Sequence, residues 1–80
     1  MVRVLWAGPY TVYVFAEQGG QHHKPHCHVY WADGKASVSI PSLRVFAGNP
    51  LSRQLRELLE QNLGKLKAGW NQMNPDRTIR

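Results

Sequence analysis

The chain has 80 residues and a formal net charge of +5, from ten Lys and Arg against five acidic residues. This length predicts one small domain, and no stretch is apolar enough for a membrane span or a signal peptide. The single cysteine excludes an internal disulfide and fits a cytoplasmic location. A basic surface favours anionic partners, nucleic acid first, although an acidic protein would satisfy the same charge.

Three strands are predicted along the first half of the chain. Residues 9–16 combine aromatic and β-branched side chains, as strands prefer, and both faces of this strand are apolar. A loop with two glycines follows it. Residues 26–31 and 35–40 are then predicted as a hairpin, with Asp33-Gly34 as a type I′ turn.

The predicted hairpin has two distinct faces. In the register that an Asp33-Gly34 turn sets, Val29 lies opposite Val38 and His28 opposite Ser39, so apolar residues meet apolar ones. The inward face is predicted to hold Cys27, Val29, Trp31, Ala36, Val38 and Ile40. The outward face is predicted to hold His26, His28, Tyr30, Lys35, Ser37 and Ser39.

A short fourth strand at residues 43–46 and one long helix are predicted to complete the chain. Asn49 is the expected N-cap, with Pro50 at the first helical position. The helix carries one apolar stripe, formed by Leu51, Leu55, Leu58, Leu59, Leu63, Leu66, Trp70 and Met73. We therefore predict an α+β domain over residues 1–74: a three- to four-stranded antiparallel meander with one long C-terminal amphipathic helix packed on one face. Residues 75–80 are predicted as a flexible basic tail.

All four histidines lie between positions 22 and 28. Because side chains alternate along a strand, His26 and His28 point to the same side, beside Tyr30. Cleavage of RNA through its own 2′-OH needs a base, an acid and a cation, and histidine and lysine can supply them. We predict His26 and His28 as the acid–base pair, with Tyr30 stacking on a base. The predicted RNA-binding residues are Lys24, Lys35, Ser37 and Ser39.

Two other interpretations fit the same residues. Histidines two apart on a strand can ligate one metal ion, with His22 or His23 as a third ligand, so zinc or adventitious nickel is the alternative to having no cofactor. The second alternative is structural, because imidazole and tyrosine rings also pack against a partner subunit. Cys27 points into the predicted core, where a thiol is usually inert.

The order of three segments resembles a known family. They are the strand at residues 10–15, the motif Pro25-His26-Cys27-His28-Val29, and the Leu-rich helix from Leu51 to Trp70. With them the chain resembles the domain of unknown function 4160 family over about residues 8–74. Cys27 replaces the family's usual Phe, and Ser42-Leu43-Arg44 stands where an acidic residue is typical. The resemblance implies a fold similar to the one derived above. It also implies a bacterial toxin–antitoxin arrangement, in which the partner is a cognate protein encoded by a neighbouring gene.

A looser similarity connects the chain with HicA-type messenger-RNA interferase toxins, which are small, basic and cytoplasmic. It lies in His22-His23, Asp33-Gly34-Lys35, Val38-Ser39-Ile40-Pro41 and residues 55–59, although a strand replaces the first helix of those toxins. The expected function is an RNA-binding component of a toxin–antitoxin-type system, acting as a metal-independent endoribonuclease. The alternatives are a non-catalytic interaction module, as an antitoxin or homo-oligomer, and a histidine metal-binding domain. No membrane partner is expected.

Overall fold

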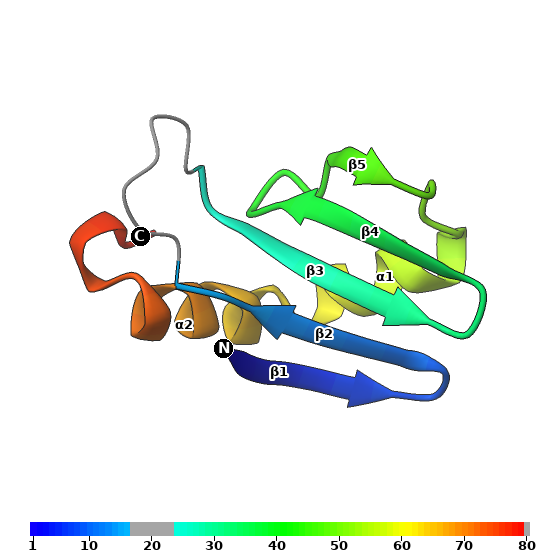
Figure 1. Cartoon of the computed structure of the whole chain (residues 1–80), viewed down its shortest axis with the longest axis horizontal. Coiled ribbons are helices and arrows are strands. Elements are labelled where there is room, and N and C mark those ends of the chain that lie inside the picture. The colour runs from blue at the N-terminus through cyan, green and yellow to red at the C-terminus, as the bar shows by residue number, and fades with distance from the viewer. Residues whose placement is uncertain (17–23, 80) are drawn as a thin grey trace.

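The computed structural model of the protein describes residues 1–16 and 24–79. These residues form a five-stranded antiparallel sheet with helices on one side (Figure 1). The strands are β1 (Val2–Ala7), β2 (Tyr10–Val14), β3 (His26–Trp31), β4 (Gly34–Ser39) and β5 (Val45–Gly48). The helices are α1 (Arg53–Gln61), α2 (Leu63–Met73) and the short 3₁₀ helix η1 (Pro75–Arg77). Because the strands are neighbours in chain order, the sheet is a meander, and the predicted α+β class is confirmed.

Strand β1 is an addition to the predicted sheet, which therefore has five strands in place of three or four. It pairs with β2, and the register shifts between Arg3 and Leu5. This bulge lets the neighbouring residues Val4 and Leu5 both pack against the core. The alternation of inward and outward side chains is interrupted at the bulge, so a search for alternating apolar residues could not reveal the strand.

The predicted type I′ turn at Asp33-Gly34 is wrong. The last pair of the β3–β4 ladder is Trp31 with Gly34, so the turn residues are Ala32 and Asp33. Neither of them has the positive φ that a type I′ turn requires. A Cβ added to Gly34 would lie 2.5 Å from Cε2 of Trp31, so this glycine makes room for the indole. The register differs from the prediction by two residues, a shift that keeps every side chain on its predicted face.

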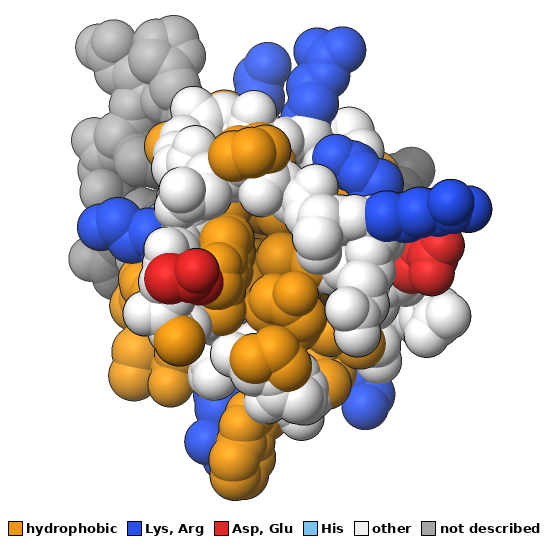
Figure 2. All heavy atoms as spheres, turned by 90° about the vertical axis from the view of Figure 1, so that its right-hand side faces the viewer, with side chains coloured by type: hydrophobic (Ala, Val, Ile, Leu, Met, Phe, Trp, Pro, Cys, Tyr) orange, Lys and Arg blue, Asp and Glu red, His pale blue; other side chains and the backbone are white. Residues whose placement is uncertain are grey.

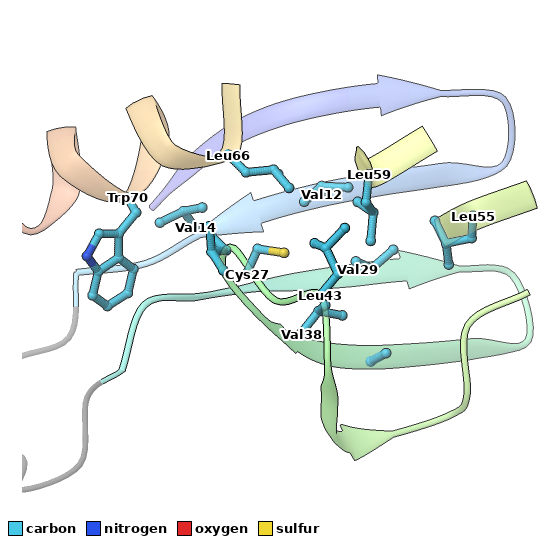
Figure 3. Packing of buried hydrophobic residues seen from close by; sticks show 12 residues of the cluster. Val12, Val14, Cys27, Val29, Val38, Leu43, Leu55, Leu59, Leu66 and Trp70 are labelled. Carbon is cyan, nitrogen blue, oxygen red and sulfur yellow. The ribbon is translucent and has the colours of Figure 1, made fainter. Parts of the chain in front are cut away.

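The core lies between the sheet and the helices (Figure 3). Its buried residues are Val12, Val14, Cys27, Val29, Ala36, Val38, Ile40, Leu43, Leu55, Leu59, Leu66 and Trp70. Every residue predicted for the inward face of the hairpin is buried except Trp31, which is partly buried. The Trp31 ring lies 6.0 Å from that of Tyr10, in an edge-on arrangement. The predicted leucine stripe packs against this cluster, as expected of an amphipathic helical layer.

The fourth predicted strand is displaced from residues 43–46 to Val45–Gly48. Leu43 has a φ of 59° and is buried, so this residue turns the chain and contributes to the core before the strand begins. At the other end of β5, Gly48 has a φ of 91°. A Cβ added there would meet the carbonyl oxygen of Lys35, so this position requires glycine for both conformation and space.

The Gly48→Ala variant is therefore expected to lower the free energy of unfolding by about 1–3 kcal/mol. Gly64→Ala is the matched control, because a Cβ at Gly64 meets nothing within 4 Å and this glycine lies in α2. The control should gain about 0.5–1 kcal/mol from helix propensity. Urea unfolding followed by circular dichroism measures both values. Equal stability of the two variants would contradict the role assigned to Gly48.

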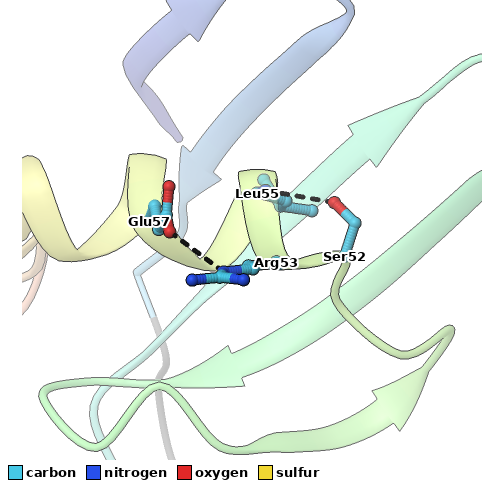
Figure 4. A network of polar contacts seen from close by, with 4 residues as sticks. All are labelled: Ser52, Arg53, Leu55 and Glu57. Carbon is cyan, nitrogen blue, oxygen red and sulfur yellow. Dashed lines mark hydrogen bonds and ion pairs between the residues drawn. The ribbon is translucent and has the colours of Figure 1, made fainter.

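The predicted N-cap at Asn49 is wrong, because Ser52 caps α1 (Figure 4). The Ser52 hydroxyl oxygen accepts a hydrogen bond from the Leu55 N–H at 3.1 Å. Asn49 instead extends the end of the sheet: its Oδ1 accepts from the Lys35 N–H at 3.1 Å, and its own N–H donates to the Lys35 carbonyl at 2.8 Å. Asn and Ser are both common N-cap residues, so residue type alone could not decide between Asn49 and Ser52. The hydrogen bonds of Asn49 to Lys35, which is distant in sequence, decide it.

Two helices replace the single long helix of the prediction. Asn62 separates them, and its Nδ2 donates to the Leu58 carbonyl at 2.8 Å. The break lies before Gly64, which is the first glycine within the predicted helix and belongs to α2. Gly69 has a different role, because a Cβ there would collide with the Val4 side chain, so this glycine allows α2 to approach β1 closely. No helix in the described residues is long and apolar enough to cross a membrane.

Hydrogen bonds connect the residues after α2 to that helix. Trp70 Nε1 donates to the Arg77 carbonyl at 2.7 Å. Asn71 exchanges two hydrogen bonds with the backbone of Ile79, at 2.9 and 2.6 Å. Ile79 is also partly buried against the core. The segment predicted as a basic tail thus begins with η1, and residue 80 lies outside the described part.

Candidate functional site on the outer sheet face

The candidate site lies on the outer face of the sheet, which we define as the face opposite the helices. In the β3–β4 ladder His26 pairs with Ser39, His28 with Ser37, and Tyr30 with Lys35. Directly opposite residues share a face, so the six side chains predicted to point outward do lie together. All of them are exposed or half-buried: His26, His28, Tyr30, Lys35, Ser37 and Ser39.

His28 has neighbours on β4 and just after the end of β2. Its Nδ1 lies 3.2 Å from the Ser37 hydroxyl oxygen on β4. On the other side, its ring centroid is 4.8 Å from that of Phe15, with the rings edge to face. A hydroxyl group can donate or accept, so Ser37 can serve both the neutral and the protonated imidazole. These contacts fix the orientation of the ring.

His26 has a defined tautomer in its neutral form. Its Nδ1 lies 2.8 Å from the Lys24 carbonyl oxygen, which can only accept a hydrogen bond, so Nδ1 carries the hydrogen. The lone pair of the neutral ring is therefore on Nε2. The ring centroid lies 5.1 Å from that of His28, 5.4 Å from Phe46 and 5.5 Å from Trp70. The two imidazoles are thus adjacent, and one of them touches the indole of the helical layer.

An open pocket of about 240 Å³ brings together four of the predicted site residues, His28, Tyr30, Lys35 and Ser37. Ala36, Ala47 and Gly48 complete its lining. The other two predicted RNA-binding residues, Lys24 and Ser39, line a different pocket of about 570 Å³, together with Pro25, Ile40, Ser42 and Arg44. The structure thus divides the predicted binding residues between two hollows.

Aromatic residues from other strands also belong to this face, and the sequence prediction did not include them in the site. The Tyr13 ring lies 5.8 Å from Tyr30 and 6.4 Å from Phe15, and Phe46 adjoins His26. With the histidines these side chains form a continuous series of rings across β2, β3 and β5. Tyr13 and Phe15 alternate with buried valines, so their outward direction was visible in the sequence. The residues that pair with this strand in the sheet could not be read from the sequence.

Cys27 lies on the opposite face of β3, as predicted. It is fully buried, and burial raises the pKa of its thiol to about 12. The thiol is therefore protonated at neutral pH, which makes it a poor nucleophile and a poor metal ligand. Any chemistry on β3 belongs to the histidine side of the strand.

A metal centre is not assembled within residues 1–16 and 24–79, where no group of three or more His, Cys, Asp or Glu residues could hold an ion. The predicted third ligand, His22 or His23, lies outside the described residues. The structure thus supplies two adjacent imidazoles, from His26 and His28, to any such site.

A separate hollow with a mixed polar and apolar lining is formed by the β1–β2 turn and α1. Hydrophobic side chains gather at this end of the molecule, with Lys and Arg side chains around them (Figure 2). The hollow has a volume of about 280 Å³ and is lined by Ala7, Gly8, Pro9, Tyr10, Gln54, Glu57, Leu58 and Gln61. None of the predicted site residues lines it, so it is distinct from the histidine face.

These features define a class: a small α+β protein whose open sheet face presents two histidines within a series of aromatic rings. The family model described as Domain of unknown function (DUF4160) matches residues 10–71, and the chain belongs to this family. The match extends from β2 into α2 and leaves out β1. Neither a curated protein nor a solved structure gives a match. The similarity to HicA-type toxins is not confirmed by these comparisons.

Proposed function

We propose that the protein is the RNA-binding component of a bacterial toxin–antitoxin-type system and that it cleaves RNA without a metal ion. The observation that carries this proposal is the adjacency of His26 and His28, with ring centroids 5.1 Å apart, next to the pocket that contains Lys35. Two imidazoles at this separation can reach one phosphodiester and its neighbouring 2′-OH. The partner would be the cognate protein encoded by a neighbouring gene.

The hydrogen bond of His26 to the Lys24 carbonyl favours His26 as the base, which leaves the role of acid to His28. Neutral His26, with its lone pair on Nε2, accepts the proton of the 2′-OH. The 2′-oxygen attacks phosphorus, the bond from phosphorus to the 5′-oxygen breaks, and protonated His28 gives its proton to that oxygen. The products are a 2′,3′-cyclic phosphate and a 5′-hydroxyl. The Lys35 ammonium stabilises the negative charge that develops on the phosphate oxygens.

The distribution of charge favours an anionic ligand on this face. Among the described acidic residues, Asp33 lies in the β3–β4 turn, Glu57 and Glu60 lie on α1, and Asp76 lies in η1. Glu57 is also paired with Arg53 at 3.4 Å, on the helical side of the molecule. None of the residues in the five described strands is acidic, and Lys35 lies on the outer face. Lys35 therefore provides electrostatic attraction for a phosphate bound there.

The test is cleavage of a long transcript by untagged protein in excess EDTA. We expect the wild type to cleave, and His26→Ala and His28→Ala to lose at least about a hundredfold in rate, which is the usual contribution of acid–base catalysis. Lys65→Ala is the control, because Lys65 is exposed on α2 in the opposite layer. Mass spectrometry should find the cyclic phosphate. Unchanged cleavage by His28→Ala, or none by the wild type, would refute the mechanism.

A non-catalytic interaction module is the second candidate, and the exposure of two aromatic rings favours it. Phe46 is 58% exposed and Tyr30 is 39% exposed, and exposed aromatic residues are common anchors of protein interfaces. In that case Phe46→Ala should abolish co-purification with the neighbouring gene product, while the wild type alone should show no turnover.

A further inference from the structure

Strand β1 extends the outer face beyond the pocket. Trp6 pairs with Thr11 of β2, and Thr11 in turn pairs with Tyr30 of β3. Tyr30 pairs with Lys35 of β4. Because directly opposite residues share a face, these side chains form one row across four strands. Trp6 therefore lies on the same face as the candidate site, and it is 69% exposed.

A second row runs beside the first and contains a candidate catalytic residue. Arg3 pairs with Tyr13, Tyr13 with His28, and His28 with Ser37. The Arg3 guanidinium also lies 4.9 Å from the centre of the Trp6 ring, a cation–π arrangement. An exposed indole and a cation thus lie together at the edge of the face, in line with Tyr30 and His28.

We propose that Trp6 and Arg3 form an additional subsite that makes the outer face a platform for single-stranded RNA several nucleotides long. This inference rests on the proposed function and adds the ligand class. From Trp6 on β1 to Tyr30 on β3 there are two inter-strand steps of about 4.8 Å, or about 10 Å. That is about three times the 3.4 Å between stacked nucleotides, so one base at Trp6 and another at Tyr30 belong to different nucleotides.

The side chains on this face distinguish a single strand from a duplex. Aromatic rings bind bases by stacking, which requires a free base face, and a duplex covers the faces of its bases. Arg3 provides a charge for a phosphate beside the indole, as Lys35 does near Tyr30. Lysine is depleted at protein interfaces, whereas arginine and aromatic residues are enriched there, so Lys35 is the residue of this face that favours RNA over a protein ligand.

The test compares labelled single-stranded oligonucleotides of about 2 and about 12 nucleotides, because the shorter cannot reach from Tyr30 to Trp6 and the longer lies within common site sizes. Fluorescence anisotropy gives the Kd of each with the full chain, with both histidines intact and cleavage prevented by 2′-O-methyl groups, which keep the RNA sugar and block attack by the 2′-oxygen. Trp6→Ala should weaken binding of the longer oligonucleotide about tenfold and leave the shorter one nearly unchanged. Trp6→Tyr, which keeps a ring, should restore most of the affinity. A duplex of the longer sequence should bind more weakly than the single strand.

The outcomes separate this inference from the proposed function. If the wild type binds the single strand and Lys35→Ala weakens both lengths, but Trp6→Ala matches the wild type, the β1 subsite is refuted and RNA binding stands. If the duplex binds as tightly as the single strand, the proposed ligand class is wrong. If the wild type binds neither oligonucleotide nor the long transcript, the proposed function fails and the subsite fails with it. Trp6 is exposed, so loss of folding is not expected, and circular dichroism checks this.

Discussion

Replacement of Trp70 by alanine is expected to lower the free energy of unfolding by about 3–5 kcal/mol, as does truncation of other buried large side chains. Small domains have a total stability of about 5–10 kcal/mol, so this variant should be largely unfolded under mild stress. The physical reason is that Trp70 is fully buried and its Nε1 donates to the Arg77 carbonyl at 2.7 Å. Removing the ring leaves a cavity between sheet and helix and an unpaired carbonyl. Urea unfolding followed by far-ultraviolet circular dichroism measures the loss.

The Trp70→Phe variant separates packing from hydrogen bonding. It retains much of the ring volume, so we expect a loss of about 1–3 kcal/mol and a folded protein. Because the Trp70 ring lies 5.5 Å from that of His26, this variant should also shift the NMR signals of His26 more than those of Tyr30. Trp70→Ala within 1 kcal/mol of the wild type would contradict the assigned packing of α2.

The faces of the hairpin could be predicted from the sequence, whereas its register could not. Alternation fixes which residues point inward, and Cys27 and His28 were assigned correctly on this basis. A register shift of two residues leaves that pattern unchanged, so the predicted and observed registers differ only in the position of the turn. Asp33-Gly34 suggested one turn, but the indole of Trp31 occupies the space beside Gly34 and sets the turn one residue earlier. A contact between side chains therefore overrode the local turn preference.

Two other differences between the prediction and the structure also arise from contacts between segments that are distant in sequence. Strand β1 was missed because its bulge places Val4 and Leu5 on the same side, which removes the alternation from the sequence. The helix start was misplaced because Asn49 and Ser52 are both suitable caps, and only the bonds from Asn49 to Lys35 exclude the first. Each outcome depends on pairing between segments that are distant along the chain, which single-sequence patterns do not contain.

The candidate site was also predictable only in part, for its residues on β3 but not for their neighbours from the rest of the sheet. The period of a strand placed His26 and His28 on one face, and the structure places them side by side. The neighbours that shape the site come from other strands: Phe15 against His28, and Phe46 against His26. Trp6 joins the face through β1, the strand that was not predicted. The sequence thus identified the two adjacent histidines, and the sheet topology determined what surrounds them.

Alkaline pH is expected to destabilise the protein through Cys27. Burial raises the pKa of its thiol from the ordinary value of 9.0 to about 12 in the folded state. Above pH 9 the unfolded chain loses this proton while the folded chain keeps it, so the unfolded state binds fewer protons. The free energy of unfolding should therefore fall as pH rises. One group contributes about 1.4 kcal/mol per pH unit, until the folded thiol also titrates.

The comparison with Cys27→Ala isolates this contribution. All other ionisable side chains are the same in the two proteins, so their effects largely cancel in the difference between the two curves. The alanine variant should start lower at neutral pH, because it leaves a small cavity at a fully buried position. Its stability should then fall less steeply, so the curves should converge between about pH 9 and 11 in urea unfolding measurements. Curves that stay parallel would mean that the thiol reaches water in the folded state. The same access would make Cys27 react readily with iodoacetamide at neutral pH. A thiol buried in the core should instead react only as fast as the protein unfolds locally or globally.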